Sequence, residues 1–205
     1  MSAAGDAPEA DNPFSTRHVR PGAISYFFPP HQDLEVLLAK LQQHDWRGQI
    51  VGPHGSGKST LLAALVPRLE QAGRRPLCVT LHDGQRRLPS DLARQADLDR
   101  ATIVIVDGYG QLSRASRWRL RYFCRRRGLG LLISSHVDAG LPELLRTTSD
   151  PDLACRIVVH LLGPRGGAVS AEDVAHSFAR HRGNLREVLM ELYDVYETRR
   201  EDGPS

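Results

Sequence analysis

The chain has 205 residues, enough for one α/β domain with a small addition but short for two full domains. It is 40% hydrophobic and 25% charged with a net charge of +3, an ordinary globular composition that predicts a packed core. No apolar stretch approaches the roughly 20 residues that a membrane-spanning helix needs, and the first residues lack a secretory-signal pattern. The cysteines Cys78, Cys124 and Cys155 lie far apart, which argues against a disulfide framework or zinc site and favours a reducing, cytoplasmic setting.

The predicted elements alternate between strands and helices along most of the chain. Residues 1–13 are expected to form a disordered tail, and residues 14–45 an irregular segment followed by an amphipathic helix from about His31 to His44. Strands are predicted at 49–51, 76–81, 101–107, 129–134 and 156–162, and helices at 58–72, 89–97 and 113–127. The alternation predicts an α/β fold, a three-layer sandwich with a mostly parallel five-stranded sheet.

The composition changes after residue 163. Residues 163–167 are expected to be a turn or linker, and Ser170 with Asp173 resembles a capping box at the start of a helix. A second helix is predicted after Gly183–Asn184. Residues 166–200 are therefore predicted to be a small C-terminal helical flank, followed by a tail at 201–205.

One segment carries the strongest chemical signal. It fits the pattern G-x-x-x-x-G-K-[ST] between a short strand and a helix, and consists of Gly52, Pro53, His54, Gly55, Ser56, Gly57, Lys58, Ser59 and Thr60. Glycines allow consecutive backbone N–H groups to point at one phosphate, and the helix N-terminus adds positive potential. We expect Lys58 to contact the outer phosphates and the Ser59 hydroxyl to bind Mg²⁺. Residues 46–165 are thus predicted to be a P-loop nucleotide-binding domain.

A second magnesium ligand is expected from another strand end. Asp107 closes the apolar run ATIVIVD about 50 residues after the P-loop, which is the place where such proteins carry a Walker B aspartate. Asp107 is therefore the predicted partner of Ser59 at the metal.

These motifs resemble a known class. GPHGSGKST, VIVDGYGQL and ISSH together look like an ASCE-class P-loop NTPase, the group that contains the AAA+ and ABC ATPases. The segment NPFSTRHVRPG before the P-loop is similar to AAA-type ATPases of general secretion systems, and HRGNLREVLMELYD resembles the AAA+ lid helix with its sensor 2 arginine, here Arg186. The resemblance implies ATP and Mg²⁺ as ligands. ABC membership is disfavoured because no LSGGQ-like signature precedes Asp107.

The chain departs from this class at one functional position. The resemblance implies a glutamate beside Asp107 that orients the attacking water, but Gly108, Tyr109, Gly110 and Gln111 follow instead. Gln111 can orient a water as a neutral group, and His136 or Ser135 can contact the γ-phosphate. The alternatives are that His136 is a plain surface histidine and that Arg186 lies on a solvated helix face. Slow or partner-stimulated hydrolysis is therefore expected.

The base preference is read from one absent motif and two aromatic residues. No N-K-x-D element for guanine is present, which favours ATP over GTP. Tyr109 or Trp46 can stack on adenine, although a core or surface role is the commoner explanation for such residues.

Three functions remain open. The first is an ATPase acting as a regulatory or motor module on a macromolecular partner, protein or nucleic acid, through the arginine-rich stretch Arg114–Arg127; homo-oligomerisation fits this function. The same arginines are equally explained as a solvated helix face. The second is a small-molecule kinase with Asp83 as base and with Arg86, Arg87 and the run Arg125–Arg127 as phosphate clamps, although Asp83-Gly84 also fits a simple turn. The third is a nucleotide-dependent binding module without turnover.

Overall fold

A five-stranded parallel sheet forms the centre of the protein. The computed structural model describes residues 12–82, 84–89, 98–163 and 169–201. The strands run in the order β2-β3-β4-β1-β5 and every neighbouring pair is parallel. Their bounds are β1 Arg47–Val51, β2 Arg75–Thr80, β3 Thr102–Asp107, β4 Gly130–Ser135 and β5 Glu143–Arg146. The predicted α/β fold with a five-stranded sheet is confirmed.

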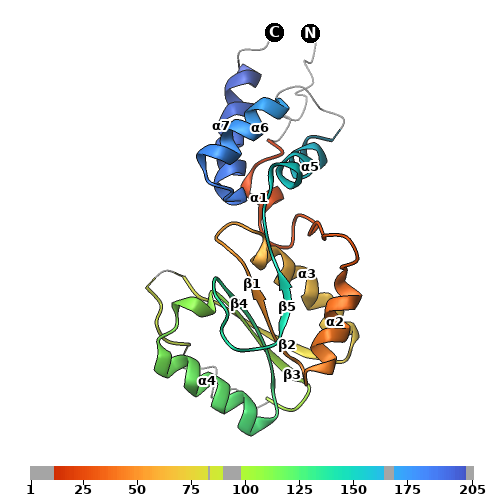
Figure 1. Ribbon diagram of the computed structural model, residues 1–205, viewed down its shortest axis with the longest axis vertical. Helices are drawn as coiled ribbons and strands as arrows, with labels where there is room; N and C mark the ends of the chain where they lie inside the picture. Colours follow the sequence, from red (N-terminus) through yellow and green to blue (C-terminus); the bar gives the residue numbers. More distant parts are fainter. Residues whose placement is uncertain (1–11, 83, 90–97, 164–168, 202–205) are drawn as a thin grey trace, which may run out of the picture.

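Helices cover both faces of this sheet, which gives three layers (Figure 1). Helices α2 (Leu34–Gln43) and α3 (Lys58–Gln71) lie on one face, and α4 (Arg114–Arg127) lies on the other. Strand β3 shows how one apolar run serves both layers, because side chains alternate along a strand. Its Ile103 and Ile105 pack with α2 and α3, while Val104 and Val106 pack with α4.

Local signals set the ends of these helices. The side chain of Asp33 accepts a hydrogen bond from the backbone of α2, and Ser113 does the same for α4, so both act as N-caps. Gly128 ends α4 in the left-handed region at φ 68°, which glycine adopts without strain. The predicted helices at 31–44, 58–72 and 113–127 are confirmed within a few residues, whereas most of the predicted helix at 89–97 lies outside the described residues.

The fifth strand was placed wrongly from the sequence. Residues 156–162 belong to helix α5 (Pro151–Leu162), which Asp150 caps and in which Pro151 occupies the first turn. Buried Ala154, Ile157, Val158 and Leu162 follow helical spacing. The true fifth strand, β5, has only two buried residues, Leu144 and Leu145, and lies at the sheet edge. So short an edge strand leaves little periodic signal.

A separate cluster of helices stands beyond the end of the sheet (Figure 1). It consists of α5, α6 (Ala171–Arg180) and α7 (Leu185–Glu201), which share one apolar core, and the short α1 (Thr16–Val19) lies beside it. The predicted capping box of Ser170 and Asp173 is confirmed. Asn12 is 4% exposed, and its side-chain amide donates to the Tyr193 carbonyl on α7, so ordered chain precedes the expected start at residue 14. Residues 1–11, 164–168 and 202–205, which hold most of both predicted tails and of the linker, lie outside the described residues.

Candidate functional site

The loop between β1 and α3 has the backbone that phosphate binding requires. Gly55 and Gly57 have φ values of 68° and 86°, in the left-handed region that L side chains rarely adopt. Gly57 directly precedes Lys58, the first residue of α3, so the helix N-terminus faces into the loop. A Cβ at Gly52 would lie 2.5 Å from the Thr147 carbonyl oxygen, so only glycine fits there. The loop thus has the backbone geometry of an anion-binding nest at a helix N-terminus.

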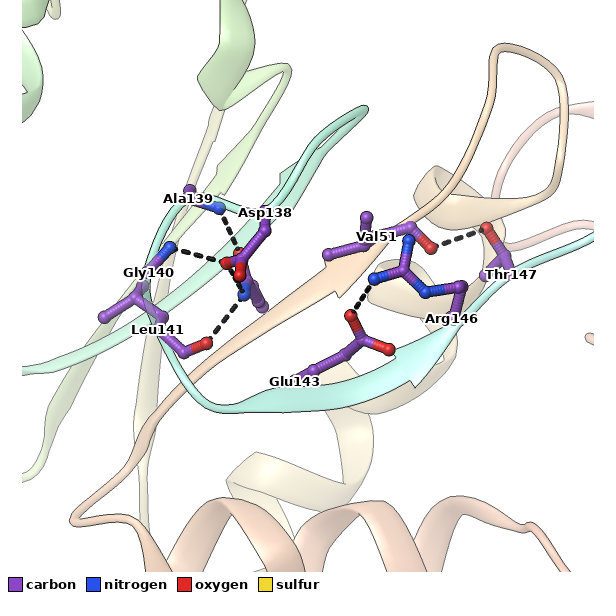
Figure 2. Close-up of polar contacts among 9 residues, drawn as sticks. Val51, Asp138, Ala139, Gly140, Leu141, Glu143, Arg146 and Thr147 are labelled. Carbon is purple, nitrogen blue, oxygen red and sulfur yellow. Dashed lines mark hydrogen bonds and ion pairs between the residues drawn. The ribbon is translucent and has the colours of Figure 1, made fainter.

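Thr147 supports this loop from the edge of the sheet. It follows β5, and Figure 2 shows its hydroxyl directed at the Val51 carbonyl, 3.4 Å away at the end of β1. The Thr147 hydroxyl also lies 2.6 Å from that of Ser56, which donates in turn to the Pro53 carbonyl at 2.8 Å. The hydroxyl pair therefore links the base of the P-loop to the residue that follows β5, a strand that the sequence did not reveal.

Lys58 places a positive charge inside the loop. Its side chain is 8% exposed, and its ammonium donates to the carbonyls of Gly52 at 2.8 Å and Pro53 at 2.5 Å. Burial lowers the pKa of Lys58, and the nearby charge of Asp107 partly opposes this shift. Ser59 and Thr60 follow in the first turn of α3, beside the same nest.

Asp107 lies across the site at the end of β3. Since β4 is inserted between β1 and β3, its last residues lie between the P-loop and this carboxylate. Ser134 on β4 donates its hydroxyl hydrogen to Asp107 Oδ1 at 2.5 Å and accepts from the Gly108 N–H at 2.9 Å. Ser134 thus orients the carboxylate expected to bind Mg²⁺.

The sequence reasoning missed Ser134 and named its neighbour Ser135. Ser135 contributes its backbone carbonyl, which accepts from the Gly52 N–H at 3.1 Å. The register aligns Val106 with Ile133, so Asp107 comes beside Ser134 one residue later. The signal was present in the sequence as two serines at a strand end, but the strand order and register decide which of them faces the acid.

His136 lies against the P-loop. Its Nδ1 atom is 3.4 Å from Lys58 Nζ and 3.2 Å from the Gly52 carbonyl oxygen, and its ring stacks on that of His54 with centroids 3.7 Å apart. Burial, followed by the charge of Lys58, lowers the pKa of His136. The imidazole is therefore neutral at neutral pH and lies beside the cation that the phosphates would contact.

The segment after Asp107 forms a short 3-10 helix, η2 (Tyr109–Gln111). Gln111 is half-buried in this turn, and its backbone N–H donates to the Gly108 carbonyl at 2.9 Å. It also lines a polar pocket of about 380 Å³ together with Gly84, Arg86, Gly110, Leu112, Ser113 and Arg114. Gln111 thus lies one short turn beyond Asp107.

Neither aromatic candidate for adenine stacking lies free at the P-loop. Tyr109 is 1% exposed within the core under α4, and its hydroxyl accepts from Arg121 Nε at 3.0 Å. Trp46 precedes β1 at the end of the strand opposite the P-loop, where the Arg74 guanidinium lies over its ring. Tyr109 is therefore a core residue, and Trp46 lies at the opposite end of β1 from the P-loop. Tyr26, by contrast, lies 3.3 Å from the position of a Cβ on Gly57.

The C-terminal helices reach the P-loop through Asn184. A Cβ on Gly55 would lie 2.6 Å from Asn184 Cγ and 3.0 Å from its Cα, so the loop and the residue before α7 touch closely. Asn184 Oδ1 also accepts from the Arg186 N–H at 3.2 Å, the geometry of an N-cap. Arg186 is exposed in the first turn of α7, next to this contact. The sequence indicated Arg186 but not Asn184.

The predicted metal ligands, one hydroxyl and one carboxylate, fit a magnesium ion that a nucleotide shares. No group of three or more His, Cys, Asp or Glu side chains gathers among residues 12–82, 84–89, 98–163 and 169–201. A P-loop magnesium ion needs only a hydroxyl and a carboxylate, the roles predicted for Ser59 and Asp107, because phosphates and water complete its shell. Within the same ranges, no helix is long and apolar enough to cross a membrane.

Comparisons with known proteins agree with this architecture. No family model and no curated protein matches the sequence. Among solved structures, a point variant of Thermotoga maritima RuvB matches with a TM-score of 0.53 and 15% identity, covering 76% of this chain and 59% of that one. The Walker-type ATPase paby2304 of Pyrococcus abyssi matches with a TM-score of 0.56 and 14% identity, covering 86% and 69%. The chain therefore spans about three fifths of RuvB, and it shares the fold of these two structures.

Proposed function

We propose that this protein binds Mg-ATP at residues 52–60 and hydrolyses it slowly, as a regulatory or motor module acting on a macromolecular partner. The observation that carries the proposal is the buried Lys58 ammonium inside a left-handed glycine loop, with the Asp107–Ser134 pair close by. In this proposal Lys58 binds the outer phosphates, while Ser59 and Asp107 hold Mg²⁺. The absence of an N-K-x-D element favours adenine.

Slow turnover follows from the residues beyond Asp107. A general base must lie within hydrogen-bond reach of the attacking water. Gly108, Tyr109 and Gly110 offer no carboxylate, and the Tyr109 side chain is buried in the core. Gln111 has no basic group, and the pKa of His136 is lowered by burial and by the charge of Lys58, which makes its imidazole a weak base. Both can position the water, but neither accepts its proton efficiently. We expect basal phosphate release well below about 10 s⁻¹, the median for enzymes, and faster release would contradict this assignment.

The helical cluster supports a conformational role for the nucleotide. Asn184 touches Gly55 at the P-loop, and Arg186 lies in the first turn of the helix that Asn184 caps. If Arg186 contacts the γ-phosphate, the bound nucleotide favours one position of α7 over another. A ligand that binds one of two conformations more tightly shifts the population toward that conformation. Homo-oligomerisation is part of the same proposal, and a sizing column with and without Mg-ATP tests it.

A kinase is the second candidate, and the polar pocket beside Gln111 is the observation that favours it. The pocket is about 380 Å³ in volume, and Arg86 and Arg114 line it as phosphate clamps would. The expected base, Asp83, lies outside the described residues, and the other expected clamps, Arg87 and Arg125–Arg127, are exposed.

ATP turnover with no acceptor present separates the two functions. An ATPase releases phosphate steadily, and more rapidly when its partner is added. A kinase shows almost no release until a phosphate acceptor is supplied. If phosphate is released steadily and neither a partner nor an acceptor changes the rate, a simple ATPase is favoured over both the partner-stimulated ATPase and the kinase.

A further inference from the structure

Helix α4 presents two aromatic side chains to solvent. Its inner side buries Leu120 and Cys124 against the sheet, whereas Trp118 is 66% and Tyr122 is 52% exposed. The two rings are nearly parallel, with an interplanar angle of 10° and centroids 5.5 Å apart. Figure 1 shows α4 on the outer face of the sheet, away from the helical cluster of α5–α7. Large apolar rings so exposed indicate a binding surface.

The seven arginines of this stretch divide into two groups with different roles. Arg117 and Arg121 point back into the protein. Arg117 donates to the carbonyls of Gly110 and Leu112, and Arg121 donates to the Tyr109 hydroxyl and the Ala139 carbonyl. These two residues are structural, and they tie α4 to the η2 turn that follows Asp107.

The other five arginines are exposed, and two of them share a helix face with the aromatic pair. Arg114, Trp118, Tyr122 and Arg126 recur every four residues, so they form one stripe along the helix. Arg126 Nη1 lies 3.3 Å from the Tyr122 hydroxyl, which accepts its hydrogen bond. The exposed members of this group are Arg114, Arg119, Arg125, Arg126 and Arg127. The sequence of α4, RASRWRLRYFCRRR, contains no carboxylate to neutralise them.

We propose that this face of α4 binds single-stranded nucleic acid, with bases stacking on Trp118 and Tyr122 and phosphates pairing with the flanking arginines. The proposal rests on the proposed function and deepens it by naming its partner class. A parallel ring pair offers an outer face on which a base continues the stack, and every base has such a face. Guanidinium groups bind phosphates in a bidentate manner.

The aromatic pair favours this partner over two others. A duplex keeps its bases stacked internally, so it would leave both rings unused. An acidic protein surface would use the arginines but has no need of two parallel exposed rings. Binding at α4 would also reach the nucleotide site, because Arg117 holds the Gly110 carbonyl three residues beyond Asp107.

The test is fluorescence anisotropy of the full chain with labelled 20-nucleotide dT and rU strands, a 20-base-pair duplex and polyglutamate. We expect both single strands to bind more tightly than the duplex and polyglutamate. With about four phosphates neutralised, the affinity should fall about 50-fold between 50 and 200 mM salt. Trp118→Ala and Tyr122→Ala should each weaken binding about 5- to 150-fold. Arg125→Gln with Arg126→Gln should weaken it and flatten the salt dependence.

Two controls keep this test separate from the nucleotide site. Tyr193→Ala removes another exposed aromatic, on α7, and should leave strand binding unchanged. Melting with Mg-ATP reports nucleotide binding, which the α4 variants should retain even where strand binding is lost. Failure of the wild type to bind either strand at 50 mM salt would overturn the proposal. So would binding that survives loss of both rings, or polyglutamate bound as tightly as the strands.

Discussion

Replacing Lys58 by Met tests the nucleotide site most directly. Met keeps an unbranched stem of similar length but removes the ammonium that donates to the Gly52 and Pro53 carbonyls. Hydrogen bonds to charged groups contribute about 1.5–3 kcal/mol each. If Lys58 makes one such bond to a phosphate, its loss lowers ATP affinity about 10- to 150-fold. The folded protein itself should melt within a few degrees of the wild type, because the lost charge was buried and partly desolvated.

The expected shift in melting temperature follows from the binding equation. Mg-ATP at 100 times its wild-type Kd stabilises the folded state by about 2.7 kcal/mol. For a chain of this size that corresponds to about 5–11 °C. A 100-fold weaker variant at the same ATP concentration gains only about 0.4 kcal/mol, or about 1–2 °C.

The matched control is Lys40→Met, which changes the chain's other lysine. Lys40 Nζ donates to the Leu144 carbonyl at 3.2 Å, so it too bonds a backbone oxygen, but on α2 rather than in the P-loop. Lys40→Met should keep the full ATP-dependent shift. Equal shifts for wild type and Lys58→Met would refute the reasoning and place the nucleotide elsewhere.

Three further predictions concern the surrounding residues. Asp107→Asn should abolish the dependence of ATP affinity on Mg²⁺ while sparing metal-free ATP binding. Ser134→Ala should lower the affinity for Mg²⁺ about 10- to 100-fold, because it removes the hydroxyl that orients Asp107. ATP titrations with and without Mg²⁺ check both variants, and an unchanged metal requirement in Asp107→Asn would exclude Asp107 from the site. The pKa of His136 is lowered below its ordinary 6.5, so the unfolded chain takes up its proton first and folding stability falls as pH drops through 6.5. Thermal melts at several pH values should show that acid lowers the stability of His136→Gln less than that of the wild type. At higher pH, the stabilities of the two proteins should depend on pH in the same way. Gly55→Ala should lower the free energy of unfolding by at least about 1–2 kcal/mol in denaturant melts, because φ at this position is 68° and the new Cβ meets Asn184. Adding Asn184→Ala should recover part of the lost stability. If nothing is recovered, the contact between the two residues is not the cause of the loss.

The features that the sequence determined by itself are contiguous. The P-loop needs its glycines, Lys58 and Ser59 within one short stretch, and the flanking strand and helix are equally local. The unbroken apolar run ending at Asp107 indicated a strand buried on both faces, and the structure confirms it. Ser113 and Gly128 bound α4 through cap interactions that involve neighbouring residues alone.

Tertiary structure decided everything that depends on which strands are neighbours. Ser134 faces Asp107 because β4 is inserted between β1 and β3 in a particular register, and no local pattern encodes that order. The strand β5 is short and recognisable mainly by its pairing with β1. The apolar residues of α5 suggested a strand, but Asp150 caps them as a helix.

Long-range packing also assigned the side chains whose roles were ambiguous in the sequence. Seven arginines look alike along α4, yet contacts with the η2 turn and the Ala139 carbonyl give Arg117 and Arg121 a structural role and leave the others to solvent. Asn184 meets Gly55 although more than half of the chain separates them. Local chemistry depends on residues adjacent in the chain, so sequence patterns report it, whereas contacts between distant residues exist only after the sheet and helices have packed.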